Sequence, residues 1–94
     1  MNIYIVTYTL VNDASSQKNS RLIDLIKEEG IWARLGDSSY LVQSDFTSVQ
    51  LRDKYKQALE PNDILYVGRV TVPAAWSGYS DEVSKWIIEK LKKY

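Results

Sequence analysis

The chain has 94 residues with 12 basic and 12 acidic side chains, so its formal net charge is zero. This length predicts a single domain over residues 1–94, and the balanced charge argues against general binding to nucleic acid or anionic membranes, which needs a basic excess. Cysteine and histidine are absent, which excludes disulfides, thiol nucleophiles, imidazole bases and the usual zinc, haem and iron–sulfur ligand sets.

The composition therefore predicts no cofactor and leaves only an oxygen-ligated Mg²⁺ or Ca²⁺ site open. The apolar start at residues 3–11 is too short to span a bilayer and lacks the basic region of a signal peptide. Since no disulfide is needed, we expect a cytoplasmic protein without membrane contact.

The alternation of strand-like and helix-like segments predicts an α+β fold. Thr47 and Gln50 form a T-x-x-Q capping box ahead of the second helix, and Ser80 caps the third. In chain order, we expect a strand at 2–10, a helix from Ser15 or Ser16 to about Glu29 with Gly30 as its stop, strands at 31–35 and 39–43, a helix ended by 61–63, a strand at 64–72, a loop at 73–79 and a C-terminal helix. This order predicts a ferredoxin-like βαββαβ antiparallel sheet with an additional C-terminal helix.

The first and last strands are apolar on both faces, whereas a sheet covered on one side should alternate apolar and polar residues. In the first strand, Ile3 and Ile5 oppose Tyr4, Val6, Tyr8 and Leu10; in the last, Ile64, Tyr66 and Val70 oppose Leu65 and Val67. Three covers are open for the second face: the C-terminal helix, a second subunit, or single-stranded nucleic acid stacked on Tyr4, Tyr8 or Tyr66. Leaving several such side chains exposed would be costly, at about 1.5–3 kcal/mol for each.

Motifs along nearly the whole chain resemble those of a family of small bacterial SinR-like proteins, which are unrelated to the helix-turn-helix repressor of that name. The segments that carry this resemblance are Ile3-Tyr4-Ile5-Val6-Thr7-Tyr8, the Glu28-Glu29-Gly30 helix end, a hairpin with Trp32, Leu51-Arg52-Asp53-Lys54, Asn62-Asp63-Ile64-Leu65, Ala74-Ala75-Trp76-Ser77-Gly78-Tyr79 and Val83-Ser84-Lys85-Trp86. The Ala-Ala-Trp-Ser-Gly run is the most specific of these. This resemblance implies the fold more than the function.

The layout is more distantly similar to the small CRISPR-associated adaptation proteins and the virulence-associated D ribonucleases, both ferredoxin-like homodimers. Those families imply a homodimer and a link to bacterial defence or toxin–immunity systems. They usually carry an aspartate at the end of the first strand, where this chain has Thr9 after Tyr8. A threonine hydroxyl cannot hold a divalent cation as a carboxylate can, so the resemblance does not carry over the nuclease site.

A few residues are candidates for function, each beside a structural interpretation. Asp13 and Asp37 could hold a metal ion, although aspartate in a polar turn usually serves local hydrogen bonds. Arg34 could stack on a partner or face solvent. Trp76 in its loop could be a binding hot spot, or could fill the edge between the last strand and the third helix.

Together these features predict a non-catalytic homodimeric protein-interaction module. Its contact would use the apolar sheet face or the edge of the last strand, with Trp76 nearby. Two alternatives are a metal-dependent nuclease using Asp13 and Asp37, and a single-stranded nucleic-acid binder using tyrosines of the sheet.

Overall fold

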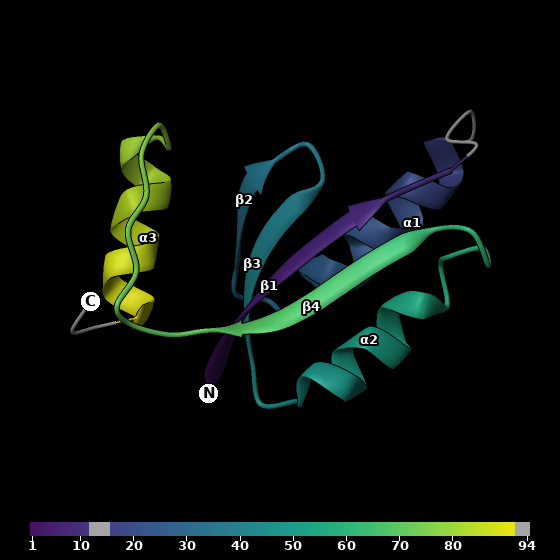
Figure 1. The fold of residues 1–94 in the computed structure, drawn as a ribbon, viewed down its shortest axis with the longest axis horizontal. Helices are drawn as coiled ribbons and strands as arrows, with labels where there is room; N and C mark the ends of the chain where they lie inside the picture. The colour runs from purple at the N-terminus through teal and green to yellow at the C-terminus, as the bar shows by residue number, and fades with distance from the viewer. Residues whose placement is uncertain (12–15, 92–94) are drawn as a thin grey trace.

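The fold has the order β1-α1-β2-β3-α2-β4-α3 in a computed structural model that describes residues 1–11 and 16–91 (Figure 1). The elements are β1 Asn2–Thr9, α1 Ser16–Lys27, β2 Trp32–Gly36, β3 Ser39–Ser44, α2 Ser48–Lys56, β4 Ile64–Val70 and α3 Asp81–Leu91. The strands form one antiparallel sheet in the order β2-β3-β1-β4. The predicted α+β, ferredoxin-like class is therefore confirmed.

Local sequence signals determine where several elements begin and end. The capping box before α2 is complete: the Gln50 N–H donates to the Thr47 hydroxyl at 3.1 Å, and the Thr47 N–H donates to the Gln50 side chain at 2.9 Å. The Val83 N–H donates to the Ser80 hydroxyl at the start of α3. Gly30 follows α1 at φ +84°, which favours glycine. The predicted cap at Ser15 lies outside the described residues.

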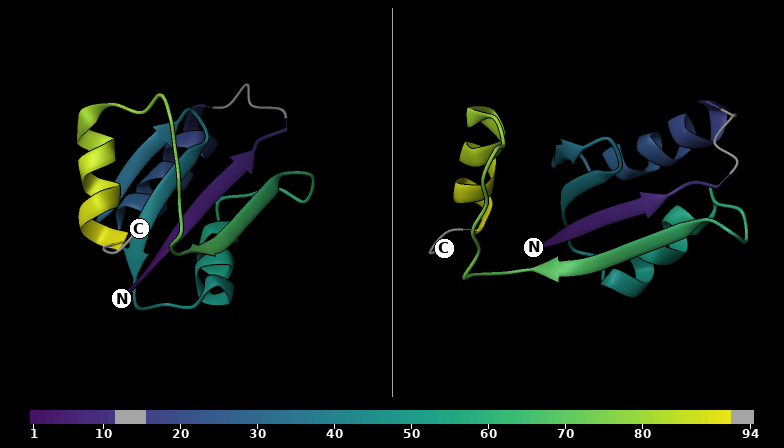
Figure 2. Two further views of the ribbon diagram at one scale, coloured as in Figure 1. Left: turned by 60° about the vertical axis from the view of Figure 1, so that its left-hand side comes forward. Right: turned by 45° about the horizontal axis from the view of Figure 1, so that its top comes forward.

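Helices α1 and α2 cover one face of the sheet, and the larger core lies beneath them (Figure 2). Its buried members are Tyr4, Val6, Tyr8, Leu22, Ile26, Tyr40, Val42, Leu51, Tyr55 and Ala58. The side chains of β1 point alternately to the two faces of the sheet and are apolar on both, as predicted. Tyr4, Val6 and Tyr8 belong to this core, while Ile3 belongs to a second core on the other face.

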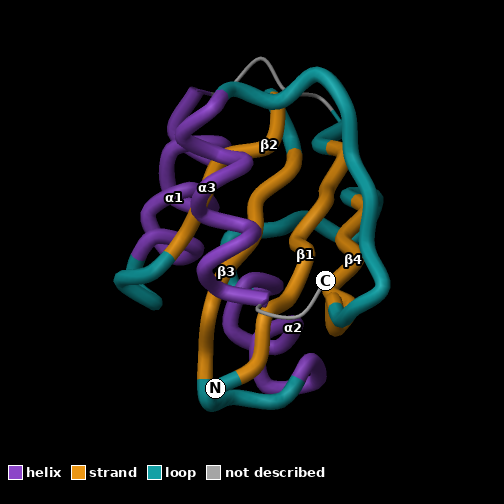
Figure 3. Tube along the Cα trace, turned by 90° about the vertical axis from the view of Figure 1, so that its left-hand side faces the viewer, coloured by secondary structure: helices purple, strands orange, loops and turns teal. Residues whose placement is uncertain are grey.

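Helix α3 packs on that second face, alongside β2 and β3 (Figure 3). Ile3, Leu41 and Ile87 are buried there, and Ile5, Leu35, Val70, Trp76, Val83, Trp86 and Leu91 pack around them. Of the three predicted covers, the C-terminal helix is thus the one present in the chain. It covers the β2 side of the face and leaves part of the β4 side exposed.

Candidate functional site

The uncovered part of the second face is a small apolar surface on β1 and β4. Ile64 and Tyr66 are each 62% exposed, and their cross-strand partners on β1 are Thr9 and Thr7, respectively. We call these four residues the open patch. A large hydrophobic side chain left in water forfeits about 1.5–3 kcal/mol of burial free energy, so two neighbouring ones are an unusual feature for so small a chain.

Tyr66 lies along its own strand over Gly68. A Cβ built on Gly68 would come 2.7 Å from the Tyr66 Cε1 atom and 3.0 Å from its hydroxyl oxygen. Glycine at position 68 therefore provides the space in which the ring lies against the backbone. The side chains of Ile64, Tyr66 and Val70, together with the backbone at Gly68, form one row on this face of β4.

β4 is also an edge strand, because it pairs with β1 alone. The Tyr8 N–H donates to the Ser38 carbonyl at 3.1 Å, which directs the backbone groups of even-numbered β1 residues toward β3. Because hydrogen bonding alternates along antiparallel strands, odd-numbered β1 residues bond to β4, and their partners there are even-numbered. The backbone N–H and C=O groups of Leu65, Val67 and Arg69 consequently point to the free edge.

The predicted interaction residues are distributed over both faces and do not form one site. Tyr4 and Tyr8 are each only 4% exposed and belong to the core under α1 and α2. The Tyr4 hydroxyl donates to the Phe46 carbonyl at 2.8 Å. The prediction that Tyr4 and Tyr8 offer a stacking surface is therefore wrong, and Tyr66 is the one tyrosine of that set that is exposed.

Trp76 and Arg34 make contacts within the chain. The Trp76 indole N–H donates to the Ser84 hydroxyl at 3.1 Å, and its ring packs in the second core between β4 and α3. This is the structural role weighed for it from sequence. Arg34 is exposed on β2, where it donates to the Gly36 carbonyl, lies 3.7 Å from Asp37 and approaches the Tyr40 ring.

Only one of the two predicted metal ligands lies in the part of the chain that the structure describes. Asp37 is fully exposed in the β2–β3 turn and pairs with Arg34, while Asp13 lies outside the part of the chain that the structure describes. Among residues 1–11 and 16–91, no group of three or more acidic side chains is placed to hold a metal ion. Within the same residues, no helix is long and apolar enough to cross a membrane.

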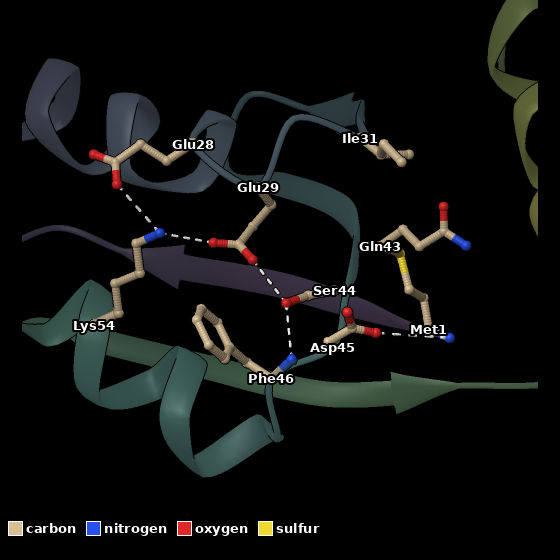
Figure 4. A pocket seen from close by; sticks show the side chains of 9 residues that line it. All are labelled: Met1, Glu28, Glu29, Ile31, Gln43, Ser44, Asp45, Phe46 and Lys54. Atoms are coloured by element: carbon tan, nitrogen blue, oxygen red, sulfur yellow. Dashed lines mark hydrogen bonds and ion pairs between the residues drawn. The ribbon is translucent and has the colours of Figure 1, made fainter.

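A pocket of about 330 Å³ lies between the end of α1, the end of β3 and α2 (Figure 4). The Glu29 carboxylate is the centre of its polar network: Oε1 accepts from the buried Ser44 hydroxyl and Oε2 from the Lys54 ammonium, both at 2.7 Å. Lys54 also lies 3.3 Å from Glu28, and Ser44 accepts from the Phe46 N–H. Both Glu29 oxygens are engaged, so this network connects elements rather than offering ligands.

The charges and burial in this network shift the pKa values of two of the residues in and beside it. Burial disfavours the charged form of Lys54, but hydrogen bonds to Glu29 and Glu28 outweigh burial and raise its pKa above the ordinary value. Tyr55 is fully buried, and its hydroxyl has no hydrogen-bond partner among the described residues. Burial first, then the negative charges of Glu29 and Glu28, raise the Tyr55 pKa, so its hydroxyl stays protonated.

A second polar cluster fixes the start of β4. The Asp63 carboxylate is buried and accepts from the Val11 N–H at 2.7 Å and the Glu60 N–H at 2.8 Å. Lys18 lies 3.0 Å from Asp63 and 3.3 Å from Glu60. The Glu60 N–H bond, followed by the Lys18 and Val11 bonds, outweighs burial and lowers the Asp63 pKa. The cluster ties α1 and the end of β1 to the α2–β4 turn.

From sequence, Tyr66 is a candidate interaction residue, while Ile64 belongs to the apolar row of the last strand without being a candidate, and Gly68 and both polar clusters carry no prediction. The signal for Ile64 was available, since the predicted topology makes the last strand an edge strand and its first residue is a large apolar one. The acids of the polar clusters have no such signal, because they stand at helix ends and turns, where carboxylates are common.

Comparison with known proteins informs the fold of this chain. No protein-family model and no curated protein matches the chain. Among solved structures, it is similar to the crystal structure of a hypothetical protein, TT1823 from Thermus thermophilus, with a TM-score of 0.64 and 19% identity over 83% of this chain and 92% of that one. Likeness at that identity concerns the fold alone.

Proposed function

We propose that the chain is a non-catalytic, homodimeric protein-interaction module whose contact surface is β4. The observation that carries this proposal is the coincidence of two unsatisfied features on one strand. β4 has a free backbone edge, and beside that edge lie Ile64 and Tyr66, each 62% exposed.

Each feature alone would be unremarkable, but together they favour a strand-adding partner. Free N–H and C=O groups at a sheet edge are a template for another strand, and proteins usually guard them with charges, proline or bulges. β4 runs for seven residues, Ile64–Val70, without proline and with Arg69 as its single charged residue. A partner there would satisfy the backbone and cover apolar area at the same time.

The groove between α2 and β4 extends this surface on the other side of the edge. Val49 on α2 is 53% exposed, and with Arg52 it lines a hollow against Leu65, Tyr66 and Val67. The positive charge of Arg52 is compensated by Asp53, whose Oδ1 lies 2.9 Å from the guanidinium. Arg52 therefore adds no uncompensated charge to this surface.

Light scattering coupled to size exclusion at roughly 50 μM chain tests the proposal, because a weak dimer with a micromolar Kd would be populated at this concentration. We expect a dimer for the native chain and a monomer for the double variant Ile64→Lys, Tyr66→Lys. Ile88→Lys is the matched control, because Ile88 is also a partly exposed apolar residue but lies on α3. A native monomer would count against the proposal.

The non-catalytic part has its own test. The native chain and Asp13→Ala should both leave single-stranded and double-stranded RNA and DNA intact in the presence of Mg²⁺ or Mn²⁺. Cleavage that is lost in Asp13→Ala would favour the metal-dependent nuclease instead. The link to bacterial defence or toxin–immunity systems is supported by the sequence resemblance alone.

A further inference from the structure

We propose that two copies of the chain pair β4 against β4 in antiparallel fashion around a two-fold axis at Val67, which would join their sheets into one continuous sheet of eight strands. The inference rests on the proposed function and specifies its interface. It follows from three properties of β4: the direction of its free backbone groups, the sizes of its side chains and the position of its charges.

Backbone geometry limits the possible registers. The free N–H and C=O groups belong to the odd-numbered residues Leu65, Val67 and Arg69, so odd-numbered residues of one copy must meet odd-numbered residues of the other. A two-fold antiparallel pairing then centres on Tyr66, Val67 or Gly68. When the two-fold axis lies at Val67, all three residues with free backbone groups find a partner within β4 of the second copy. Leu65 then faces the partner's Arg69, and Val67 faces the partner's Val67.

Side-chain sizes distinguish between these three registers. Centring on Val67 sets Tyr66 beside the partner's Gly68 and Ile64 beside the partner's Val70, so the largest side chain meets the smallest. Centring on Tyr66 would set two tyrosines against each other. Centring on Gly68 would set two glycines against each other and leave a gap. Since packed interfaces avoid both collisions and voids, the Val67 register fits best.

The Tyr66 ring is already placed for this arrangement. It lies over Gly68 of its own strand, within contact distance of the space a Cβ would fill. In the Val67 register, Tyr66 of each copy stands next to the partner's Gly68, so the two rings together cover both glycines across the seam. Aromatic side chains are known to stabilise glycines in edge strands in this way.

The charge on β4 is compatible with the same register. Arg69 is opposite Leu65 of the second copy, so no basic residue of the strand faces another. In the Tyr66 register, Arg69 would instead meet Asp63, whose carboxylate is already buried against Lys18, Val11 and Glu60. That register would therefore gain no new ion pair without breaking the existing cluster.

Cysteine cross-linking tests the register directly, because the chain contains no cysteine of its own. Leu65→Cys chains are mixed in turn with Arg69→Cys, Val67→Cys or Thr71→Cys chains, which report the Val67, Tyr66 and Gly68 registers, respectively, and leave Gly68 and the Tyr66 ring unchanged. Directly opposed residues lie within disulfide range and diagonal ones beyond it, so we expect the 65–69 product to exceed the other two about tenfold under mild oxidation. Dominance of the 65–67 or 65–71 product would overturn the register.

Amide hydrogen exchange on the native chain provides a second readout that needs no substitution. In the dimer, the amides of Leu65, Val67 and Arg69 should be protected, and dilution below the dimer Kd should remove this protection while the amides of β1 remain protected. A dimer by light scattering whose three edge amides exchange freely would overturn this inference and leave the proposed function standing. A native monomer would overturn both.

Discussion

The two edge strands of the sheet differ in almost every feature that controls strand addition. β2 is five residues long and irregular in register between Arg34 and Gly36, and α3 covers its face on one side. Arg34 also donates to the Gly36 carbonyl on the same strand. β4 is longer, is regularly paired with β1, and carries Ile64 and Tyr66 in the open.

This contrast shows how one sheet can block one edge while leaving the other available. A bulge, a charge and a covering helix are the usual means by which proteins prevent strand addition. An irregular register and the charge of Arg34 occur at β2, where α3 also covers one face of the strand, whereas β4 has Arg69 alone. The difference supports a pairing role for β4, and the following changes test it, from the largest expected effect to the smallest.

Ile87→Ala should have the largest effect, because it removes the buried anchor of α3. Ile87 is 4% exposed in the second core. Loss of a buried isoleucine side chain lowers the free energy of unfolding by about 2–5 kcal/mol, measurable by urea denaturation. This change would reduce the difference between the two edges, because it loosens the helix that covers the β2 side of the second face.

Ile88→Ala is the control for that change, since Ile88 is the next residue of α3 and is 39% exposed. We expect it to alter the free energy of unfolding by about 1 kcal/mol or less. Equal losses in the two variants would mean that α3 is not anchored through Ile87.

Asp63→Asn should have the next largest effect on the free energy of unfolding, and the size of this effect should depend on pH. The Asp63 pKa is lowered in the folded chain, so its stabilisation is complete above the unfolded value of about 4 and is lost as the pH falls through the lower folded value. The variant should therefore be less stable than the native chain at pH 7, and the difference should shrink toward about pH 2.

Urea denaturation across that pH range measures how much the Asp63 carboxylate, which directly precedes β4, contributes to the free energy of unfolding. Asp53→Asn is the control, because Asp53 is an exposed acid on α2 that pairs with Arg52. A difference between Asp63→Asn and the native chain that stays constant with pH would show that the carboxylate charge is not what holds the α2–β4 turn.

Much of the architecture could be predicted from sequence because its signals are local. The capping box at Thr47 and Gln50 and the two-sided apolar pattern of β1 each lie within a few residues, and both are present in the fold. The pattern of β1 also implied that the second face needs a cover, and α3 is that cover.

The location of the site could be predicted only in part, because alternation shows which side chains share a face but not which face receives the helices. Tyr4 and Tyr8 were therefore candidates for an open surface, and packing of α1 and α2 on their side buried them. The placement of Trp76 against Ser84 likewise depends on where α3 crosses the sheet. No local pattern carries that information.

Gly68→Ala compares the two edges at matched positions. A Cβ at Gly68 would collide with the Tyr66 ring, whereas a Cβ at Gly36 on β2 would meet nothing within 4 Å. Tyr66 is exposed and can swing away, so monomer stability should change little. The displaced ring should then weaken the proposed dimer about tenfold in Kd, or about 1.4 kcal/mol, by sedimentation equilibrium.

Gly36→Ala should leave the Kd unchanged in the same measurement. The double variant Gly68→Ala, Tyr66→Ala removes the collision and separates the effect of the ring from that of the glycine. Equal weakening by Gly36→Ala and Gly68→Ala would contradict the assignment of the interface to β4.

Arg34→Ala should have the smallest effect on the free energy of unfolding. It tests which feature of β2 prevents another strand from pairing with it. The side chain is exposed, and its contacts to the Gly36 carbonyl and Asp37 are at the surface, so we expect a change of about 0.5 kcal/mol or less in unfolding free energy. The oligomeric state by light scattering should also be unchanged, because the irregular register and α3 still keep another strand from β2. Assembly beyond a dimer in this variant would mean that the charge of Arg34 alone protects the β2 edge. Helix α3 would then not contribute to the difference between the two edges.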